Sequence, residues 1–194
     1  MRLAIGVMGS SEGPFVDGAW ERLQELGRTI AERDCVLLTG ACPGLSYAAV
    51  QGAKEVGGLV VGISPGLSLH EHVHKYGSPV DGFDVLIYTG SGLMGREIEN
   101  IRSSDIVVIA GGRSGTLGEF SIAYDEGRLI GVLTGTGGVA DAVSDLVALC
   151  NKETGAVVLY DAEPRRLIER LLAHYEAEHR VKPSSFWPPV ATTR

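Results

Sequence analysis

Three glycine-rich turns in the sequence combine residue types that bind phosphate. They read GSS at 9–11, TGACPG at 39–44 and GGRSGT at 111–116, and each separates an apolar run from a stretch of helical periodicity. The first N–H groups of a helix carry roughly half a positive charge, and glycine lets a phosphate approach them. One such turn is common in α/β proteins, whereas several on one edge predict a binding site. The candidate binding residues are Gly9, Ser10, Ser11, Gly40, Gly44, Gly111, Gly112, Ser114, Gly115 and Thr116.

Glu119 is the carboxylate that accompanies the third turn. It follows Thr116 by three residues, in a helix expected to begin at Thr116. The glycine run would deliver this carboxylate to the ligand-binding edge. The alternative is a capping box, in which Glu119 only accepts a hydrogen bond from a backbone N–H. Gly118, in the first turn of that helix, costs roughly 1 kcal/mol relative to alanine. That cost favours the close approach of another group, and both interpretations stay open.

Arg96 is the basic residue expected on the same edge. It begins the helix predicted over 96–103, directly after the turn TGSGLMG at 89–95. A guanidinium at this place is suited to grip a phosphate or a carboxylate. The alternative is a surface arginine that pairs with Glu99 or Asn100 in solvent. The segment itself favours neither interpretation.

Short apolar strands alternate with helical segments along the chain and position these residues. Strands that are apolar on both faces indicate a parallel sheet with helices on both sides, an α/β doubly wound, Rossmann-like fold. Ligands bind such sheets beyond the carboxyl ends of the strands, where the strand order reverses. The expected strands are 3–8, 35–38, 59–63, 85–88, 106–110, 129–133 and 156–159. The expected helices are 15–33, 45–56, 96–103, 116–126, 139–150 and 164–178, with a long loop over 64–83.

Length and composition limit the class of protein. With 194 residues, we expect a single domain over 1–180 and an irregular tail over 181–194, which would dock through Phe186 and Trp187. The formal net charge of −7 argues against nucleic-acid binding. Three cysteines without CxxC spacing argue against a disulfide framework and favour a reducing compartment. No apolar run suits a membrane span or a signal peptide, so a cytoplasmic protein is expected.

The segments that contain these candidates resemble the LOG family, long misnamed lysine decarboxylase-like. LTGACPGLSYAAVQGAKEVGGLVVGISP at 38–65 is similar to the family's glycine turn, alanine-rich helix and following strand. GREIENIRSSDIVVIAGGRSGTLGEF at 95–120 resembles its second signature, an arginine followed after nine residues by Asp, a strand and PGGxGTxxE. The resemblance covers about residues 3–150.

The resemblance implies a nucleoside 5′-monophosphate phosphoribohydrolase that needs no cofactor. Such an enzyme cleaves the N-glycosidic bond to give a free base and ribose 5-phosphate. Arg96 and Glu119 would be the catalytic pair, with Gly112, Gly115 and Thr116 around the 5′-phosphate. A carboxylate suits an oxocarbenium-like transition state, and an arginine would hold the phosphate or ribose. A homo-oligomer, a dimer or tetramer, is also implied.

Two departures from the family pattern point to an alternative function. The loop GGRSGT is one residue longer than the family form and follows Ala110 in place of proline. The basic residue that commonly follows the arginine is Glu97 here. These features resemble a sister branch that includes molybdenum-cofactor-carrier-like proteins. The alternative is therefore a non-catalytic carrier or sensor of a nucleotide or molybdopterin-type ligand. A third reading, a ligand sensor acting through a protein partner, would need a surface that the sequence does not reveal.

Two other groups of reactive side chains have structural interpretations. His72 and His74 would face the same way on an extended strand and bind zinc, but a solvated loop or a mobile lid over 64–83 is favoured, and no metal is expected. Cys42 lies in the second turn and would be reactive if its pKa were lowered. A small apolar filler is the favoured interpretation.

Overall fold

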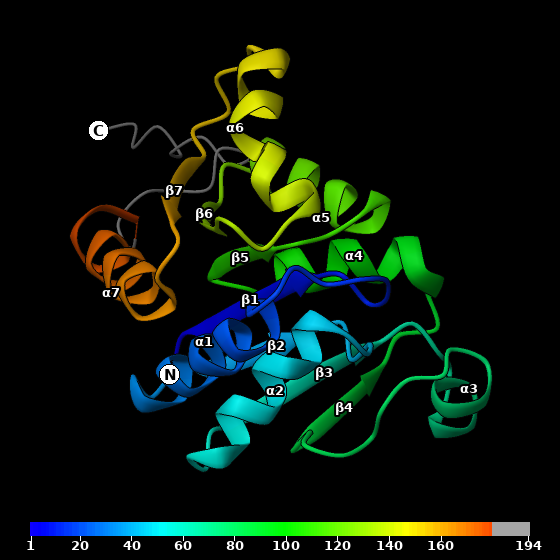
Figure 1. Cartoon of the computed structure of the whole chain (residues 1–194). Coiled ribbons are helices and arrows are strands. Elements are labelled where there is room, and N and C mark those ends of the chain that lie inside the picture. Colours follow the sequence, from blue (N-terminus) through cyan, green and yellow to red (C-terminus); the bar gives the residue numbers. More distant parts are fainter. Residues whose placement is uncertain (180–194) are drawn as a thin grey trace, which may run out of the picture.

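The computed structural model describes residues 1–179, whose strands form one sheet (Figure 1). The sheet has seven strands in the order β4-β3-β2-β1-β5-β6-β7, and every neighbouring pair is parallel. The strands are β1 (Ala4–Gly9), β2 (Val36–Thr39), β3 (Val60–Ser64), β4 (Val85–Tyr88), β5 (Ile106–Ala110), β6 (Leu129–Leu133) and β7 (Val157–Asp161). The expected doubly wound, Rossmann-like sheet is confirmed.

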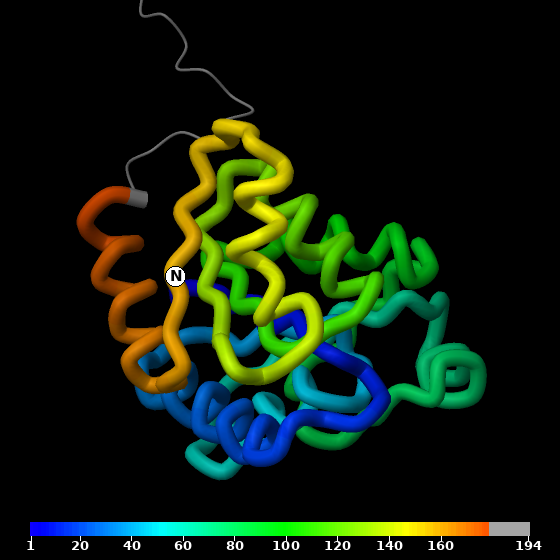
Figure 2. Tube along the Cα trace, turned by 45° about the horizontal axis from the view of Figure 1, so that its top comes forward, coloured from blue at the N-terminus to red at the C-terminus, as the bar shows by residue number. Residues whose placement is uncertain are grey.

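Helices cover both faces of the sheet (Figures 1 and 2). One core packs under α1, α2 and α7, and the other under α4, α5 and α6. In β5, Ile106 and Val108 point into the first core, and Val107 and Ile109 point into the second. The helices are α1 (Ala19–Glu32), α2 (Leu45–Glu55), α3 (Leu69–His74), α4 (Gly92–Arg102), α5 (Ser114–Asp125), α6 (Gly138–Cys150) and α7 (Pro164–His174).

The strand order reverses at β1, in the centre of the sheet. From β1 the chain builds β2, β3 and β4 on one side, and it then returns through α4 to place β5 on the other side. The loops that follow β1 and β5 diverge from this point, which opens a crevice at the carboxyl edge. The fold therefore places the first and third glycine turns beside each other.

Helices α1 and α2 pack together at unusually short distance. A Cβ built on Gly27 of α1 would lie 1.9 Å from the Ala49 carbonyl oxygen, and one on Gly52 of α2 would lie 1.9 Å from the Gln24 carbonyl oxygen. No side chain fits at either position, so the two helices meet backbone to backbone. This contact fixes the position of α2, the helix that follows the second glycine turn, against α1.

Several element boundaries differ from the expected ones. Helix α1 begins at Ala19 rather than residue 15, because Gly18 has left-handed backbone (φ 75°) at the N-cap. Helix α4 begins at Gly92, four residues before the expected start. In the segment 89–95, positive φ occurs only at Gly90 and Gly92, so the residues from Leu93 onward can join the helix. The loop expected over 64–83 contains α3, which Ser68 caps by accepting a hydrogen bond from the Glu71 N–H at 3.3 Å.

At the carboxyl end, α7 is followed by a π-helical turn, η1 (Tyr175–His179). The expected tail over 181–194, with Phe186 and Trp187, lies outside the described residues. Homo-oligomer formation stays a prediction. Exposed apolar side chains on β4 and α4 include Val85, Ile87, Leu93 and Met94, which are 46–73% exposed, and Leu149 of α6 is 80% exposed. Within residues 1–179, the helices are too short or too polar to span a bilayer.

Candidate functional site

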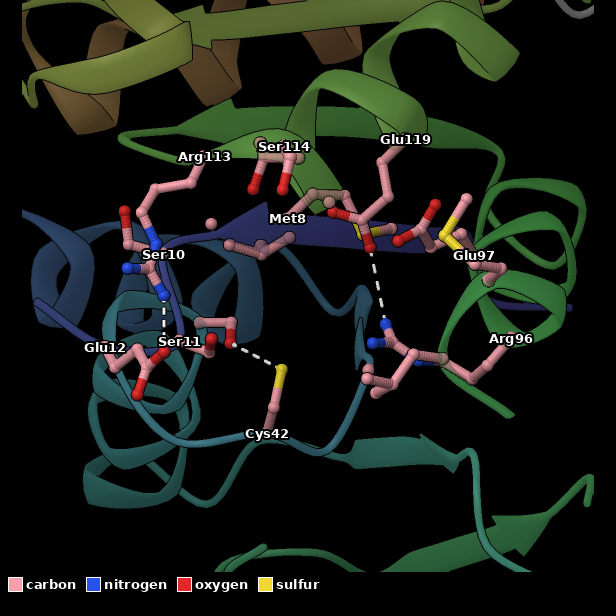
Figure 3. A pocket seen from close by; sticks show the side chains of 18 residues that line it. Met8, Ser10, Ser11, Glu12, Cys42, Arg96, Glu97, Arg113, Ser114 and Glu119 are labelled. Carbon is pink, nitrogen blue, oxygen red and sulfur yellow. Dashed lines mark hydrogen bonds and ion pairs between the residues drawn. The ribbon is translucent and has the colours of Figure 1, made fainter. Parts of the chain in front are cut away.

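A pocket of about 430 Å³ opens at the carboxyl edge of the sheet, where β1 and β5 lie side by side (Figure 3). Its walls come from the end of β1, the loops after β1, β2 and β5, the start of α2, and the first two turns of α4 and α5. The lining residues are Val7, Met8, Gly9, Ser10, Ser11, Glu12, Gly40, Cys42, Ser46, Leu93, Met94, Arg96, Glu97, Arg113, Ser114, Gly115, Thr116 and Glu119. This is the place that the topology predicts for a ligand.

One end of the pocket, the hydroxyl end, is formed by Ser10, Ser11, Glu12, Arg113 and Ser114 (Figure 3). Arg113 pairs with Glu12 across the pocket mouth and so connects the β5–α5 loop to the β1–α1 loop. Both side chains are mostly exposed, at 61% and 74%. Ser10 Oγ accepts a hydrogen bond from the Gly112 N–H at 2.6 Å. Two loops far apart in the sequence are therefore held together at this end.

The amino terminus of α5 also faces the hydroxyl end. The helix begins at Ser114, with Arg113 at the N-cap position. First-turn N–H groups have no intrahelical acceptor and carry the positive end of the helix dipole. Gly115, in this turn, adds no side chain above these groups. The hydroxyl end thus combines N–H donors, hydroxyl groups and one exposed cation, a set suited to an anion.

The other end of the pocket, the carboxylate end, contains Arg96, Glu97 and Glu119 (Figure 3). Arg96 Nη1 donates to Glu119 Oε1 at 3.3 Å, and the two side chains are each 8% exposed. The Asn100 carboxamide, oriented as its neighbours require, accepts from Arg96 Nη1 at 2.7 Å and from the Gly40 N–H at 3.2 Å. Arg96 is therefore held in a buried network.

Glu119 has a strongly perturbed pKa. Burial, opposed by the Arg96 guanidinium and assisted by the nearby Glu97 carboxyl, raises the pKa of Glu119 to about 7. A carboxyl group with such a pKa exchanges its proton near neutral pH, which is the property of a general acid or base. The arrangement can therefore hold or move one proton beside a bound ligand.

Gly40 makes room for Arg96. A Cβ built on Gly40 would lie 1.9 Å from Arg96 Nη1 and 2.5 Å from Arg96 Cζ. Gly40 does line the pocket, but the Arg96 guanidinium occupies the space that a side chain at position 40 would need. The second glycine turn thus supports the carboxylate end, while Cys42 and Ser46 bring the turn and the start of α2 to the pocket wall.

The structure brings most predicted site residues together. Three lie behind the wall: Gly44, Gly111 and Gly112 are absent from the lining. Their glycine is required by the loops themselves, since all three have positive φ, of 87°, 59° and 102°. Their neighbours fill the space that a ligand was expected to approach. The predicted residues that line the pocket are Gly9, Ser10, Ser11, Gly40, Arg96, Ser114, Gly115, Thr116 and Glu119.

The capping-box interpretation of Glu119 is wrong, and the surface-arginine interpretation is wrong in its exposure, although Asn100 is a partner of Arg96. The capping box fails because α5 begins two residues before Thr116, and the Glu119 carboxylate pairs with Arg96. Arg96 lies in the second turn of α4, not at its start, and is buried rather than solvated. Glu99 accepts instead from Ser91 Oγ.

Sequence reasoning missed several pocket residues, among them Arg113 at the hydroxyl end and Glu97 at the carboxylate end. Glu97 is 5% exposed, and burial raises its pKa, partly offset by Arg96. A Cβ on Gly118 would lie 2.8 Å from Glu97 Oε2, so the group that approaches Gly118 is this carboxyl. The sequence signal for Glu97 was its acidic side chain directly after Arg96, where the resembled family commonly has a basic residue.

The histidine segment forms no part of the pocket lining. It is helical, so the extended arrangement considered for zinc is wrong. His72 is buried, with Nδ1 2.8 Å from Ser64 Oγ and Nε2 2.9 Å from the Pro79 carbonyl oxygen. The His70 and His74 rings lie with centroids 4.6 Å apart, tilted by 50° to each other. The described residues contain no group of three or more metal-ligating side chains.

Cys42 lines the pocket, with its Sγ 3.8 Å from Ser46 Oγ. Burial raises the pKa of the Cys42 thiol. The thiol form is therefore favoured, which supports the structural interpretation over the reactive one.

Comparison with known proteins agrees with this geometry. The model of the SLOG cluster4 family matches residues 2–168. An uncharacterized protein of Archaeoglobus fulgidus is 34% identical over 131 residues, which span 68% of this chain and 80% of the relative.

Two solved structures share the fold over nearly their full length. A molybdenum cofactor binding protein from Rippkaea orientalis is 29% identical, with a TM-score of 0.71 over 89% of this chain and 97% of the other. A molybdenum cofactor carrier protein from Chlamydomonas reinhardtii is 30% identical, with a TM-score of 0.71 over 89% and 99%.

Proposed function

The chain belongs to the SLOG cluster4 family, and from this premise we propose that it binds a phosphorylated nucleotide or molybdopterin-type ligand without hydrolysing it. It acts as a carrier or sensor of that ligand. The observation that carries this proposal is the hydroxyl end of the pocket, where the amino terminus of α5 meets Ser10, Ser11 and Arg113.

The charges of the pocket favour a phosphate at the hydroxyl end. Arg96 is already neutralised by the buried Glu119 carboxylate, so it is poorly suited to an added anion. Among residues 1–179, Arg113 pairs with the exposed Glu12 carboxylate alone, a contact worth about 0–1 kcal/mol at such exposure. A phosphate replaces Glu12 at little cost and gains the first-turn N–H groups of α5.

The volume and the similar proteins support the same ligand class. A pocket of about 430 Å³ lies within the range of sites that enclose a small organic molecule. Proteins about 30% identical to this chain are described as binding or carrying the molybdenum cofactor. For such a ligand, the hydroxyl end would hold the phosphate, and the rest of the pocket would surround the ring system.

A second candidate function is phosphoribohydrolase activity, favoured by Glu119. Its pKa of about 7 suits proton transfer, and its buried position beside Arg96 suits stabilisation of a developing positive charge on ribose. In this candidate the same phosphate position holds a nucleoside 5′-monophosphate. The two functions differ only in whether the glycosidic bond is cleaved.

One experiment tests both candidates. Isothermal titration compares 5′-AMP, 5′-GMP and a pterin monophosphate with their dephosphorylated counterparts, and the recovered ligand is analysed by mass spectrometry. We expect at least tenfold tighter binding of the phosphorylated forms, from one charge-assisted hydrogen bond or more. The ligand should be recovered intact. Equal affinity with and without phosphate contradicts the proposal.

Variants separate the contributions of the two ends. Arg113→Gln should lose most of the preference for the phosphorylated form. Arg102→Gln is the matched control. Arg102 is an exposed arginine of α4 that pairs with Glu126, and neither residue lines the pocket. Release of ribose 5-phosphate that disappears in Glu119→Gln would establish the hydrolase instead of the carrier.

A further inference from the structure

Glu97 is a buried acceptor that the proposed phosphate site does not use. Its side chain projects from α4 into the carboxylate end, beside Glu119 (Figure 3). It is 5% exposed, and its Oε2 has no hydrogen-bond partner among the described residues. Buried polar atoms are almost always paired, and an unpaired one is costly. The atom therefore indicates a partner that the protein does not supply.

The surroundings of Glu97 exclude the usual protein partners. Arg96 is near enough to oppose the burial that raises the pKa of Glu97, but its Nη1 donates to Glu119 and Asn100, and its Nε is buried without a partner of its own within residues 1–179. The face of α5 opposite the carboxyl is made of glycines: a Cβ on Gly115 would lie 3.3 Å from Oε1, and one on Gly118 only 2.8 Å from Oε2. No donor side chain can stand there. The carboxyl lies between this glycine face and the pocket, which Glu97 lines.

The remaining wall at this end is apolar. Met8, Leu93 and Met94 line the pocket with Glu97, and thioether groups make favourable contacts with aromatic rings. An aliphatic amine would gain nothing from such a wall, and it would meet the Arg96 cation. A flat, neutral ring with N–H groups on one edge satisfies both the carboxyl and the apolar surface.

We propose that Glu97 binds the paired N–H donors of a 2-amino-4-oxopyrimidine ring, the edge that guanine and pterin share. This rests on the proposed function, with the ligand's phosphate at the hydroxyl end. A carboxylate matches adjacent ring N–H and amino donors with two parallel hydrogen bonds. Adenine presents one donor and one acceptor there, and hypoxanthine lacks the amino group. Glu97 is thus a specificity-determining residue of the pocket.

The test compares ligands that differ only in the amino group. Dissociation constants are measured by isothermal titration for GMP against IMP, and for pterin against lumazine, with inorganic phosphate as a separate probe. We expect GMP or pterin to bind roughly tenfold or more tightly than its partner, the usual discrimination of a bidentate pair. A preference for GMP alone identifies a nucleotide ligand, and a preference for pterin alone identifies a pterin ligand.

The Glu97→Gln variant should abolish the preference while affinity for inorganic phosphate is unchanged. Glu99→Gln, on the same helix but outside the pocket, is the matched control and should retain the preference. Circular dichroism and thermal unfolding verify that both variants fold, and the wild-type comparison stands without either. Equal binding of GMP and IMP, and of pterin and lumazine, overturns the inference while the phosphate site stands. Absence of binding by every phosphorylated probe overturns the proposed function itself.

Discussion

The two ends of the pocket each contain an arginine paired with a glutamate, but the pairs differ in their access to water. At the hydroxyl end, the Arg113 and Glu12 side chains are 61% and 74% exposed. At the carboxylate end, the Arg96 and Glu119 side chains are each 8% exposed. An exposed pair is screened and contributes little to stability, whereas a buried pair cannot lose one partner without leaving an uncompensated charge. The first pair is therefore available to a ligand, and the second is part of the fold.

The largest effect is expected from removing the buried cation. Arg96→Met leaves Glu97 and Glu119 buried without a positive charge, and should lower the free energy of unfolding by about 3–5 kcal/mol at pH 8. The loss should be smaller at pH 5, because protonation removes the uncompensated charge. Urea denaturation at both values of pH measures it.

The exposed end provides the control for that variant. Arg113→Met removes the other arginine of the pocket and should change the free energy of unfolding by less than about 1 kcal/mol. Equal losses from the two variants would show that burial does not separate the two ends.

The pH dependence of stability tests the state of Glu119. Its pKa is about 7 in the folded chain and 4.5 as the unperturbed value, so the folded state binds the proton more tightly. The stabilisation is fully present below pH 4.5 and is lost as the pH rises through 7. Over that window wild-type stability should fall by on the order of 3 kcal/mol relative to Glu119→Gln. Denaturation at pH 5 and pH 8 gives the difference, with Glu99→Gln as control. A difference that does not vary with pH contradicts the assignment.

The smallest effect is expected at the hydroxyl end. Ser10→Ala removes the acceptor of the Gly112 N–H and should cost about 1 kcal/mol of stability, with little dependence on pH. Ser11→Ala, at an exposed neighbouring position, should leave the midpoint of urea denaturation unchanged. A cost comparable to that of Arg96→Met would mean that the hydroxyl end is as deeply built into the fold as the carboxylate end.

The sheet was predictable because its signals are local. A run such as Ile106–Ala110 is apolar at every position, and only a strand buried on both faces explains that pattern at this length. Helix starts were less accurate, since they depend on single backbone angles. The left-handed backbone of Gly18 moves the start of α1 to Ala19. The glycines of the segment 89–95 predicted a turn throughout, whereas the residues after the left-handed Gly92 are helical.

The pocket was predicted through its glycine turns and through two of its charged residues, but not through Glu97 or Arg113. Glu119 and Arg96 were identified as a pair, although the local alternatives of a cap and a solvated arginine could be rejected only from the structure. Glu97 was noticed as a departure from a resembled pattern and not as a pocket residue. Its burial depends on α4 packing against α5, a contact between segments that no local pattern describes.

Gly118 and Glu97 also constrain each other's substitution during evolution. The carboxyl occupies the volume that a side chain at position 118 would need, 2.8 Å from the position of its Cβ. A lineage that keeps an acid at position 97 is therefore confined to glycine at 118, although glycine costs the helix roughly 1 kcal/mol relative to alanine. A lineage that loses the acid is free to recover that stability by a single substitution. The two positions should thus change together among relatives, and their covariation would record which descendants still bind the same ligand.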